Sequence, residues 1–353
     1  MNADLTHESR DDSLPEKLQA ELAQKIVEGF DSVISERSKH YRENPSKVPT
    51  PSAVPFIIKS YSNMNMAITG GISLIPGPWG MAAAVPEIAI IIRNQLAMIY
   101  DIGVAHGQSE VLNKELLAGI FLSALGTSVG GLLTIHSGKF LVRRTSLRVF
   151  QRIVAILGGK VTQQVLKSMV SKWLPIVGAA AMAIWSYYST RQIGKKALQI
   201  LEKPIEIVEL DSDDADILAV LAEEQAVSQT ELQFIERVSD YRILKITALI
   251  SLMRADGILN VTERTHIETL VEQAKLDSKS KIELIALIDS ETEALFDLTL
   301  LSGEPDEATG LLVDLIALAK CDGELHPAEI TFIKNASKLM GIPESDLVDV
   351  LVV

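Results

Sequence analysis

The spacing of hydrophobic and polar residues along the chain predicts helices. Between residues 14 and 42 the apolar side chains recur every three or four positions, which predicts one amphipathic helix. Its apolar face comprises Leu18, Leu22, Ile26, Phe30, Val33 and Ile34. Residues 43–55 hold four prolines and are predicted to form a linker or an extended strap.

The region that follows has few polar positions. Residues 60–86 carry no charged side chain, but glycines and prolines interrupt them. This pattern predicts a helix, a tight turn at residues 75–80, and a second helix to about His106.

Two later segments are uncharged over a length relevant to membranes. Residues 116–135 are 20 uncharged positions with a Gly126–Gly130 spacing, enough to cross about 30 Å of hydrocarbon. A transmembrane helix, the central helix of a bundle and a hairpin within one leaflet are all compatible with this segment. Residues 173–190 are shorter, and the aromatic residues at their ends fit a membrane interface: Trp173, Trp185, Tyr187 and Tyr188.

Charge is strongly segregated along the chain. The whole sequence has a net charge of −13. Residues 114–203 carry 13 basic and 2 acidic side chains, net +11, whereas residues 204–353 carry 11 basic and 31 acidic ones, net −20. Such asymmetry is typical of a protein with a charged partner, although two helical domains that attract each other would explain it equally well.

The basic side chains are densest in residues 139–152. This segment is predicted to be a basic amphipathic helix that binds anionic lipid; its alternative is a solvated face turned toward the acidic half. Nucleic acid is not expected, because the chain is acidic and has no base-reading motif. The predicted membrane-binding residues are Lys139, Arg143, Arg144, Arg148 and Arg152.

The acidic half contains a duplication. Residues 246–276 align without gaps to residues 312–342, and nine of the 31 positions are identical. In each copy an apolar helix runs into Asp-Gly, and the glycine ends the helix. Asn260 and His326 then stand at the N-cap of a second helix, with Glu263 and Glu329 three residues later, as in a capping box. Asp256 and Asp322 lie at the negative end of a helix dipole, so each needs a backbone N–H, a basic neighbour or a cation.

These paired Asp-Gly-x-Leu-x-x-x-Glu motifs resemble the tellurite-resistance TerB-like domain over about residues 230–350. The resemblance implies a compact acidic all-α domain linked to metal or membrane-stress responses. It also implies that a divalent cation, the only cofactor expected, would use Asp256, Glu263, Asp322 and Glu329. An EF-hand is excluded, because Ile258 and Leu259 stand where that loop supplies oxygen ligands.

The first half has a resemblance of its own. Segments 70–107 and 173–197 are similar to the signature segments of EcsC-like proteins and the DUF697 domain, over roughly residues 60–203. This resemblance implies a glycine-rich helical module on bacterial membranes, in some proteins the companion of a GTPase. It supplies no catalytic residues.

No catalytic motif accompanies these features. The chain has no GxxxxGK[ST], GxGxxG or HExxH sequence, and its six histidines are scattered. Its one cysteine, Cys321, fits a reducing compartment. We therefore expect a protein that is not an enzyme.

Together these patterns predict an all-α protein: a glycine-rich apolar module followed by an acidic TerB-like domain with a helix-turn-helix repeat. The predicted parts are residues 1–55 (helix and linker), 56–203 (EcsC/DUF697-like), 204–229 (acidic linker and helix) and 230–353 (TerB-like). The predicted function is that of a bacterial stress or envelope protein on the cytoplasmic face of the inner membrane. Its basic half would bind anionic lipid, and its acidic half would act as a sensor or docking surface for a protein partner or a second copy. The alternative is a soluble scaffold or GTPase companion whose apolar helices are buried.

Overall fold

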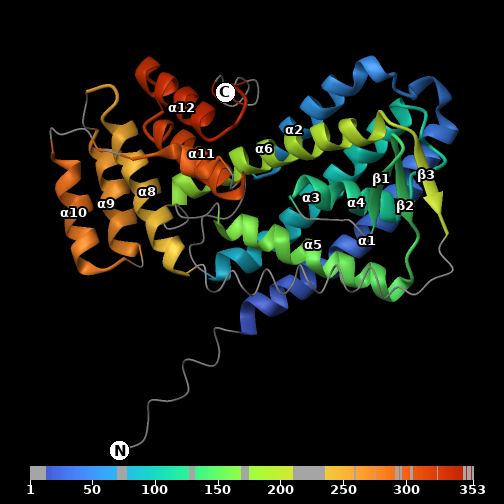
Figure 1. The fold of residues 1–353 in the computed structure, drawn as a ribbon, viewed down its shortest axis with the longest axis horizontal. Coiled ribbons are helices and arrows are strands. Elements are labelled where there is room, and N and C mark those ends of the chain that lie inside the picture. The colour runs from blue at the N-terminus through green and yellow to red at the C-terminus, as the bar shows by residue number, and fades with distance from the viewer. Residues whose placement is uncertain are drawn as a thin grey trace, which may run out of the picture. The chain divides into compact units, whose positions relative to one another are not determined.

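The computed structural model describes residues 13–69, 78–126, 132–167, 175–209, 235–257, 260–274, 276–290, 294, 296–302, 305–323, 325–344, 347 and 351. The fold is mostly helical, as predicted, with one small sheet that was not predicted (Figure 1). The chain divides into two compact units. Unit 1 comprises residues 1–73, 78–163 and 186–228, and unit 2 comprises residues 74–77, 164–185 and 229–353.

Unit 1 begins with the predicted amphipathic helix. Helix α1 spans Ser13–Glu43, and Leu22, Ile26, Phe30 and Val33 are each at most 1% exposed. The proline-rich linker forms two short 3₁₀ turns, η2 (Pro45–Lys47) and η3 (Pro51–Ala53). Helix α2 follows at Val54–Thr69.

Helix α3 (Pro78–Ala105) is the central element of unit 1, because both α1 and α2 pack against it. The two helices predicted on either side of the glycine-rich turn are therefore confirmed. Residues 75–77 of the predicted turn lie outside the described residues, and residues 78–80 already belong to α3. Within the described residues, one helix is long and apolar enough to cross a membrane, Val85–Ala105, and 78% of its apolar window is buried. A core helix has the same properties, so this observation is weak evidence for a span.

Residues 116–135 do not form one helix. Helix α4 spans only Lys114–Ala124, with Asn113 as its N-cap, and its residues 115–122 are all buried. The chain then reaches strand β1 at Leu133–His136. A 20-residue transmembrane helix is therefore wrong for this segment, because its helical part is core and its end belongs to a sheet.

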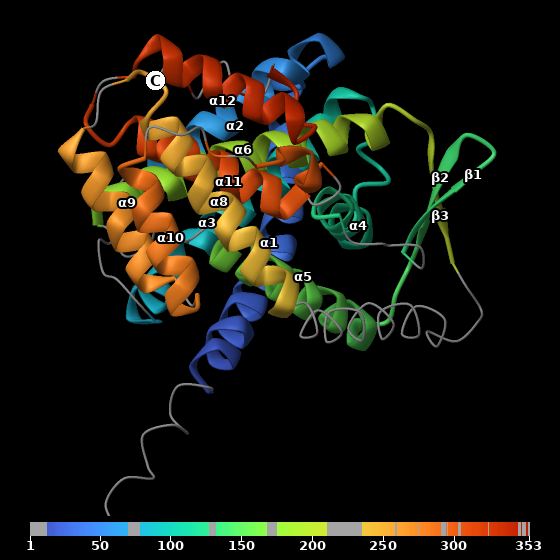
Figure 2. The ribbon, with the colours of Figure 1, turned by 60° about the vertical axis from the view of Figure 1, so that its left-hand side comes forward.

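The sheet also corrects the prediction of a basic helix. Residues Lys139–Arg143 form β2, and helix α5 begins only at Leu147 and ends at Lys167. Strand β2 pairs antiparallel with β1 and parallel with β3 (Ile205–Val208), as Figure 2 shows. The turn between β1 and β2 has positive φ at Ser137 (50°) and Gly138 (81°), as a type I′ hairpin turn requires.

Helix α6 spans Pro175–Leu201 and contains the second uncharged segment. Trp185, Tyr187 and Tyr188 are 5%, 0% and 7% exposed. These aromatic side chains are buried in the protein, so they are not the exposed interfacial residues that the sequence predicted. Trp173 lies outside the described residues.

Unit 2 contains the duplication as two helix pairs. The first pair is α8 (Ile235–Met253) and α9 (Val261–Gln273), and the second is α11 (Pro305–Ala319) and α12 (Pro327–Leu339). Helices α8 and α11 pack against each other. Helix α10 (Ser278–Ile288) and the 3₁₀ turn η5 (Leu298–Leu301) connect the two copies.

The Asp-Gly turns of the duplication have the predicted conformation. Gly257 and Gly323 have φ of 78° and 86°, a left-handed conformation that costs glycine little and other residues more. The repeated glycine is thus explained by the helix ends alone.

Candidate functional site

The duplication brings its carboxyl groups together. Glu263 and Glu329 each stand in the first turn of the second helix of a copy and are 5% and 4% exposed. The negative charges of Asp256 and Asp322 both act on the carboxyl group of Glu263. The four residues predicted as cation ligands therefore form one cluster, which we call the carboxyl cluster.

The two glutamates are bound differently. Glu329 forms the predicted capping box, in which the backbone N–H of His326 donates to Oε2 at 2.8 Å and His326 Nδ1 accepts from the N–H of Ala328 at 3.2 Å. Glu263 instead hydrogen-bonds with Glu329 across the two copies. Local capping thus explains one repeated glutamate, whereas the other depends on contact between the copies.

Burial and like charge act together on this pair. Burial, then the charges of Glu329, Asp322 and Asp256, raise the pKa of Glu263 to about 8. Burial also raises the pKa of Glu329, although its hydrogen bond from Glu263 opposes that shift. Near neutral pH Glu263 therefore keeps its proton, with which it hydrogen-bonds to Glu329.

The aspartates lie at the rim of the cluster. Asn260 Nδ2 donates to Asp322 Oδ2 at 2.8 Å, while the Asn260 Oδ1 caps α9 by accepting from Thr262 N–H at 2.8 Å. The N-cap amide of one copy thus compensates the aspartate of the other. The neighbouring thiol of Cys321 has its pKa raised to about 12 by burial and by these carboxylates, so it is not a reactive thiolate at neutral pH.

The cluster does not form a complete coordination shell as it stands. Among the described residues, no group of three or more His, Cys, Asp or Glu side chains is arranged to hold a metal ion.

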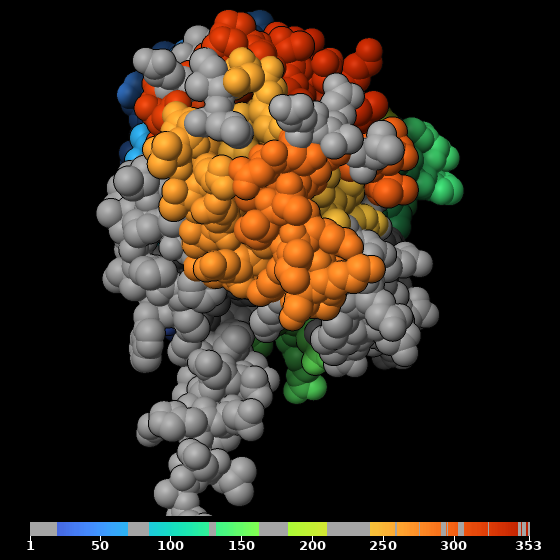
Figure 3. All heavy atoms as spheres, turned by 90° about the vertical axis from the view of Figure 1, so that its left-hand side faces the viewer, coloured from blue at the N-terminus to red at the C-terminus, as the bar shows by residue number. Residues whose placement is uncertain are grey.

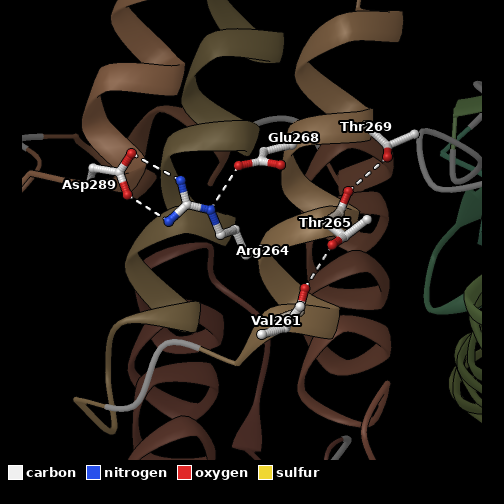
Figure 4. Close-up of polar contacts among 6 residues, drawn as sticks. All are labelled: Val261, Arg264, Thr265, Glu268, Thr269 and Asp289. Atoms are coloured by element: carbon white, nitrogen blue, oxygen red, sulfur yellow. Dashed lines mark hydrogen bonds and ion pairs between the residues drawn. The ribbon is translucent and has the colours of Figure 1, made fainter.

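The polar side chains on the outer side of α9 bond to groups of α9 itself and to Asp289. Arg264 binds both carboxylate oxygens of Asp289, at 2.6 and 3.0 Å, and its Nε donates to Glu268 at 2.8 Å (Figure 4). The repeated threonines, Thr265 and Thr331, each donate to a carbonyl four residues earlier in their own helix. Helices α9 and α10 provide much of the face of unit 2 seen in Figure 3.

The predicted membrane-binding residues lie at the surface of unit 1 on two elements. On β2, Lys139 and Arg143 alternate with the buried Phe140 and Val142, so their side chains lie on the opposite side of the strand. The exposed residues of the following loop and of α5 complete the set: Arg144, Arg148 and Arg152. We call these five residues the basic surface.

Lys139 and Arg144 of the basic surface form ion pairs. Lys139 Nζ lies 3.4 Å from Glu206 and Arg144 Nη1 lies 3.0 Å from Glu209. All four side chains are more than half exposed, and exposed pairs contribute only about 0–1 kcal/mol. Both cations are therefore available to a competing anion.

The sequence did not indicate the buried polar contacts of unit 1. Asp101, 4% exposed, accepts two hydrogen bonds from Arg37, at 2.7 and 2.6 Å, and one from Tyr61 at 2.9 Å. Asn65 and Gln95 both donate to the hydroxyl of Thr190, at 2.9 and 3.0 Å. These contacts join α1, α2, α3 and α6, so they serve packing within the unit.

Comparison with known proteins identifies part of the chain. Residues 242–351 match the family model described as tellurite resistance protein TerB. This match confirms the resemblance seen in the duplicated motif, and it places the carboxyl cluster inside the TerB domain. No curated protein and no solved structure matches the chain. The resemblance of residues 60–203 to EcsC-like proteins stays a prediction.

Proposed function

We propose that the chain is a non-enzymatic, peripheral membrane protein of a bacterial stress or envelope response. Unit 1 would bind anionic lipid at the cytoplasmic face of the inner membrane. The TerB domain would act as a sensor or as a docking surface for a protein partner or a second copy. The observation that carries the proposal is the basic surface, five cationic side chains on adjacent elements of one unit.

Peripheral binding fits the fold better than spanning. The helical part of residues 116–135 is buried in protein, and so are the described aromatic residues of α6. What unit 1 presents to an anionic bilayer is charge, and each Lys or Arg close to such a surface contributes about 1 kcal/mol. The weak ion pairs of Lys139 and Arg144 would be exchanged for lipid phosphates.

Fractionation of cells that produce the full chain tests where it resides. We expect the protein in the membrane fraction, released by high salt or alkaline carbonate. Release by detergent alone would indicate an integral protein. Recovery in the soluble fraction from the start would contradict the proposal and favour the alternative, a soluble scaffold or GTPase companion.

A charge-neutral triple variant tests the basic surface itself. Lys139→Gln, Arg144→Gln and Arg148→Gln together should weaken binding to phosphatidylglycerol vesicles about 100-fold, since three contributions of about 1 kcal/mol are lost. The matched control neutralises three exposed cations elsewhere in unit 1, Lys39, Arg42 and Lys47. Equal loss in both variants would mean that net charge, and not this surface, governs binding.

The carboxyl cluster favours a second, separate proposal: a divalent cation binds there in place of the proton shared by Glu263 and Glu329. Two buried carboxyl groups with further carboxylates nearby offer the oxygen ligands that hard cations prefer. A rise in the unfolding temperature of the full chain with calcium, magnesium or zinc, absent from Glu263→Gln, would support it. If none of the three cations raised the unfolding temperature, the cation proposal would be refuted and the lipid proposal would stand.

A further inference from the structure

The β1–β2 hairpin exposes one apolar side chain that does not pack into the core of unit 1. Along its inward row Leu133, Phe140 and Val142 are 7%, 8% and 0% exposed, whereas Ile135 is 64% exposed. Ile135 pairs directly with Phe140, so the two residues share a face of the sheet. The inward row thus continues beyond the core, as an apolar residue next to the turn.

The surroundings of Ile135 are cationic. The next pair toward the turn is His136 with Lys139, both exposed and on the opposite face of the sheet. Lys203 Nζ lies 5.5 Å from the centre of the Phe140 ring, which brings a further ammonium group to the same end of the sheet. Lys139 forms an exposed ion pair with Glu206, at 3.4 Å.

The turn and the pairing with β3 give this end of the hairpin a defined conformation. Ser137 and Gly138 both have the positive φ that matches the twist of a two-residue hairpin loop, and β2 is held on its other side by β3. Ile135 is therefore presented by paired strands and does not need an ordering step before it binds.

From this geometry we propose that the hairpin end is a membrane anchor, in which Ile135 enters the interfacial layer of an anionic bilayer while Lys139 and Lys203 bind lipid phosphates. The inference rests on the proposed lipid binding of unit 1 and adds the depth and the point of contact. A hairpin end with an apolar side chain and a cation on each face of the sheet matches the two layers of such a surface, apolar below and anionic above. An acidic protein partner would match the cations alone.

An environment-sensitive fluorophore at the hairpin end tests the depth. Cys321→Ser removes the one native thiol, and Ile135→Cys then carries a nitrobenzoxadiazole label. With phosphatidylglycerol vesicles we expect a blue shift, and quenching by spin labels in the shallow acyl region. The matched control carries the label at Val261→Cys in unit 2, which is 77% exposed and should show neither change.

Binding strength gives a second, independent measure. Ile135→Ser should weaken vesicle binding about tenfold, Ile135→Leu should leave it within about twofold, and high salt should not cancel that difference. Binding with an unchanged label spectrum and equal affinities would overturn the anchor and leave the lipid-binding proposal standing. Failure of the native chain to bind vesicles at all would overturn both.

Discussion

Both units bury a pair of unlike charges, Arg37 with Asp101 in unit 1 and Lys245 with Glu307 in unit 2, but unit 2 also buries two like-charged glutamates. Unit 1 pairs unlike charges, Arg37 with Asp101, and neutral groups around Thr190, so each partner stabilises the other. Unit 2 brings like charges together in the carboxyl cluster, where Glu263 and Glu329 need a proton between them. Buried groups of the first kind fix a structure, whereas groups of the second kind make stability depend on what the solution supplies, a proton or a cation.

The largest effect should come from breaking the unlike pair of unit 1. Asp101→Ala leaves the guanidinium of Arg37, 25% exposed, without its carboxylate, and should lower the free energy of unfolding of unit 1 by about 3 kcal/mol. Calorimetry or hydrogen exchange of α1 and α3 would measure the loss.

The control for Asp101 is the exposed pair of Arg93 with Glu36, whose side chains are 41% and 57% exposed. Glu36→Ala should cost less than 1 kcal/mol. If the two variants were equally stable, the buried pair would have no special part in holding α1 on α3.

The neutral network should give the next largest effect. Thr190→Val keeps the volume but removes the acceptor for Asn65 and Gln95, both at most 2% exposed. Two buried amide donors then lose a partner, which should cost about 2 kcal/mol. Thr69→Val is the matched control, because the hydroxyl of the buried Thr69 donates to carbonyl groups of its own helix. Chemical denaturation should show a much smaller loss for that variant.

The like-charged pair should make the free energy of unfolding of unit 2 depend on pH. The carboxyl of Glu263 would titrate near 4.5 in the unfolded chain and titrates near 8 in the folded one. Between these values the unfolded state releases a proton that the folded state keeps, so the free energy of unfolding falls as pH rises from about 4.5 to 8 and is level above.

Glu263→Gln tests the origin of that slope, because the amide donates to Glu329 at every pH. We expect a flatter profile and a gain of roughly 1–2 kcal/mol at pH 8, allowing for solvent screening. Glu272→Gln, which removes an exposed carboxylate of the same helix, is the control. A slope that survives in Glu263→Gln would place the titrating group elsewhere.

Some of these features could be predicted from the sequence alone, and others could not. Helix α1 and the Asp-Gly turns follow from local patterns, and the structure confirms them. The hairpin was missed because the basic residues of 139–152 obscured the strand alternation, and because β2 is completed by β3, some 60 residues later. Composition alone could not distinguish protein from lipid as the surroundings of residues 116–122. The repeat identified Glu263 and Glu329 as a pair, but their shared proton depends on how the two copies pack.

The smallest effect should come from the contact that joins the two copies at the rim of the cluster. Asn260→Ala removes the cap of α9 and the amide donor to Asp322, and should cost about 1 kcal/mol. Asn260→Asp separates the two roles, because a carboxylate still caps the helix but faces Asp322 with a like charge. It should therefore destabilise unit 2 mainly above pH 5 and move the end of the Glu263 titration to higher pH. Asp277→Ala, which removes the cap of α10 alone, should lower stability with no change in that titration. If Asn260→Asp left the titration where it is, the two copies would be coupled through the glutamates only.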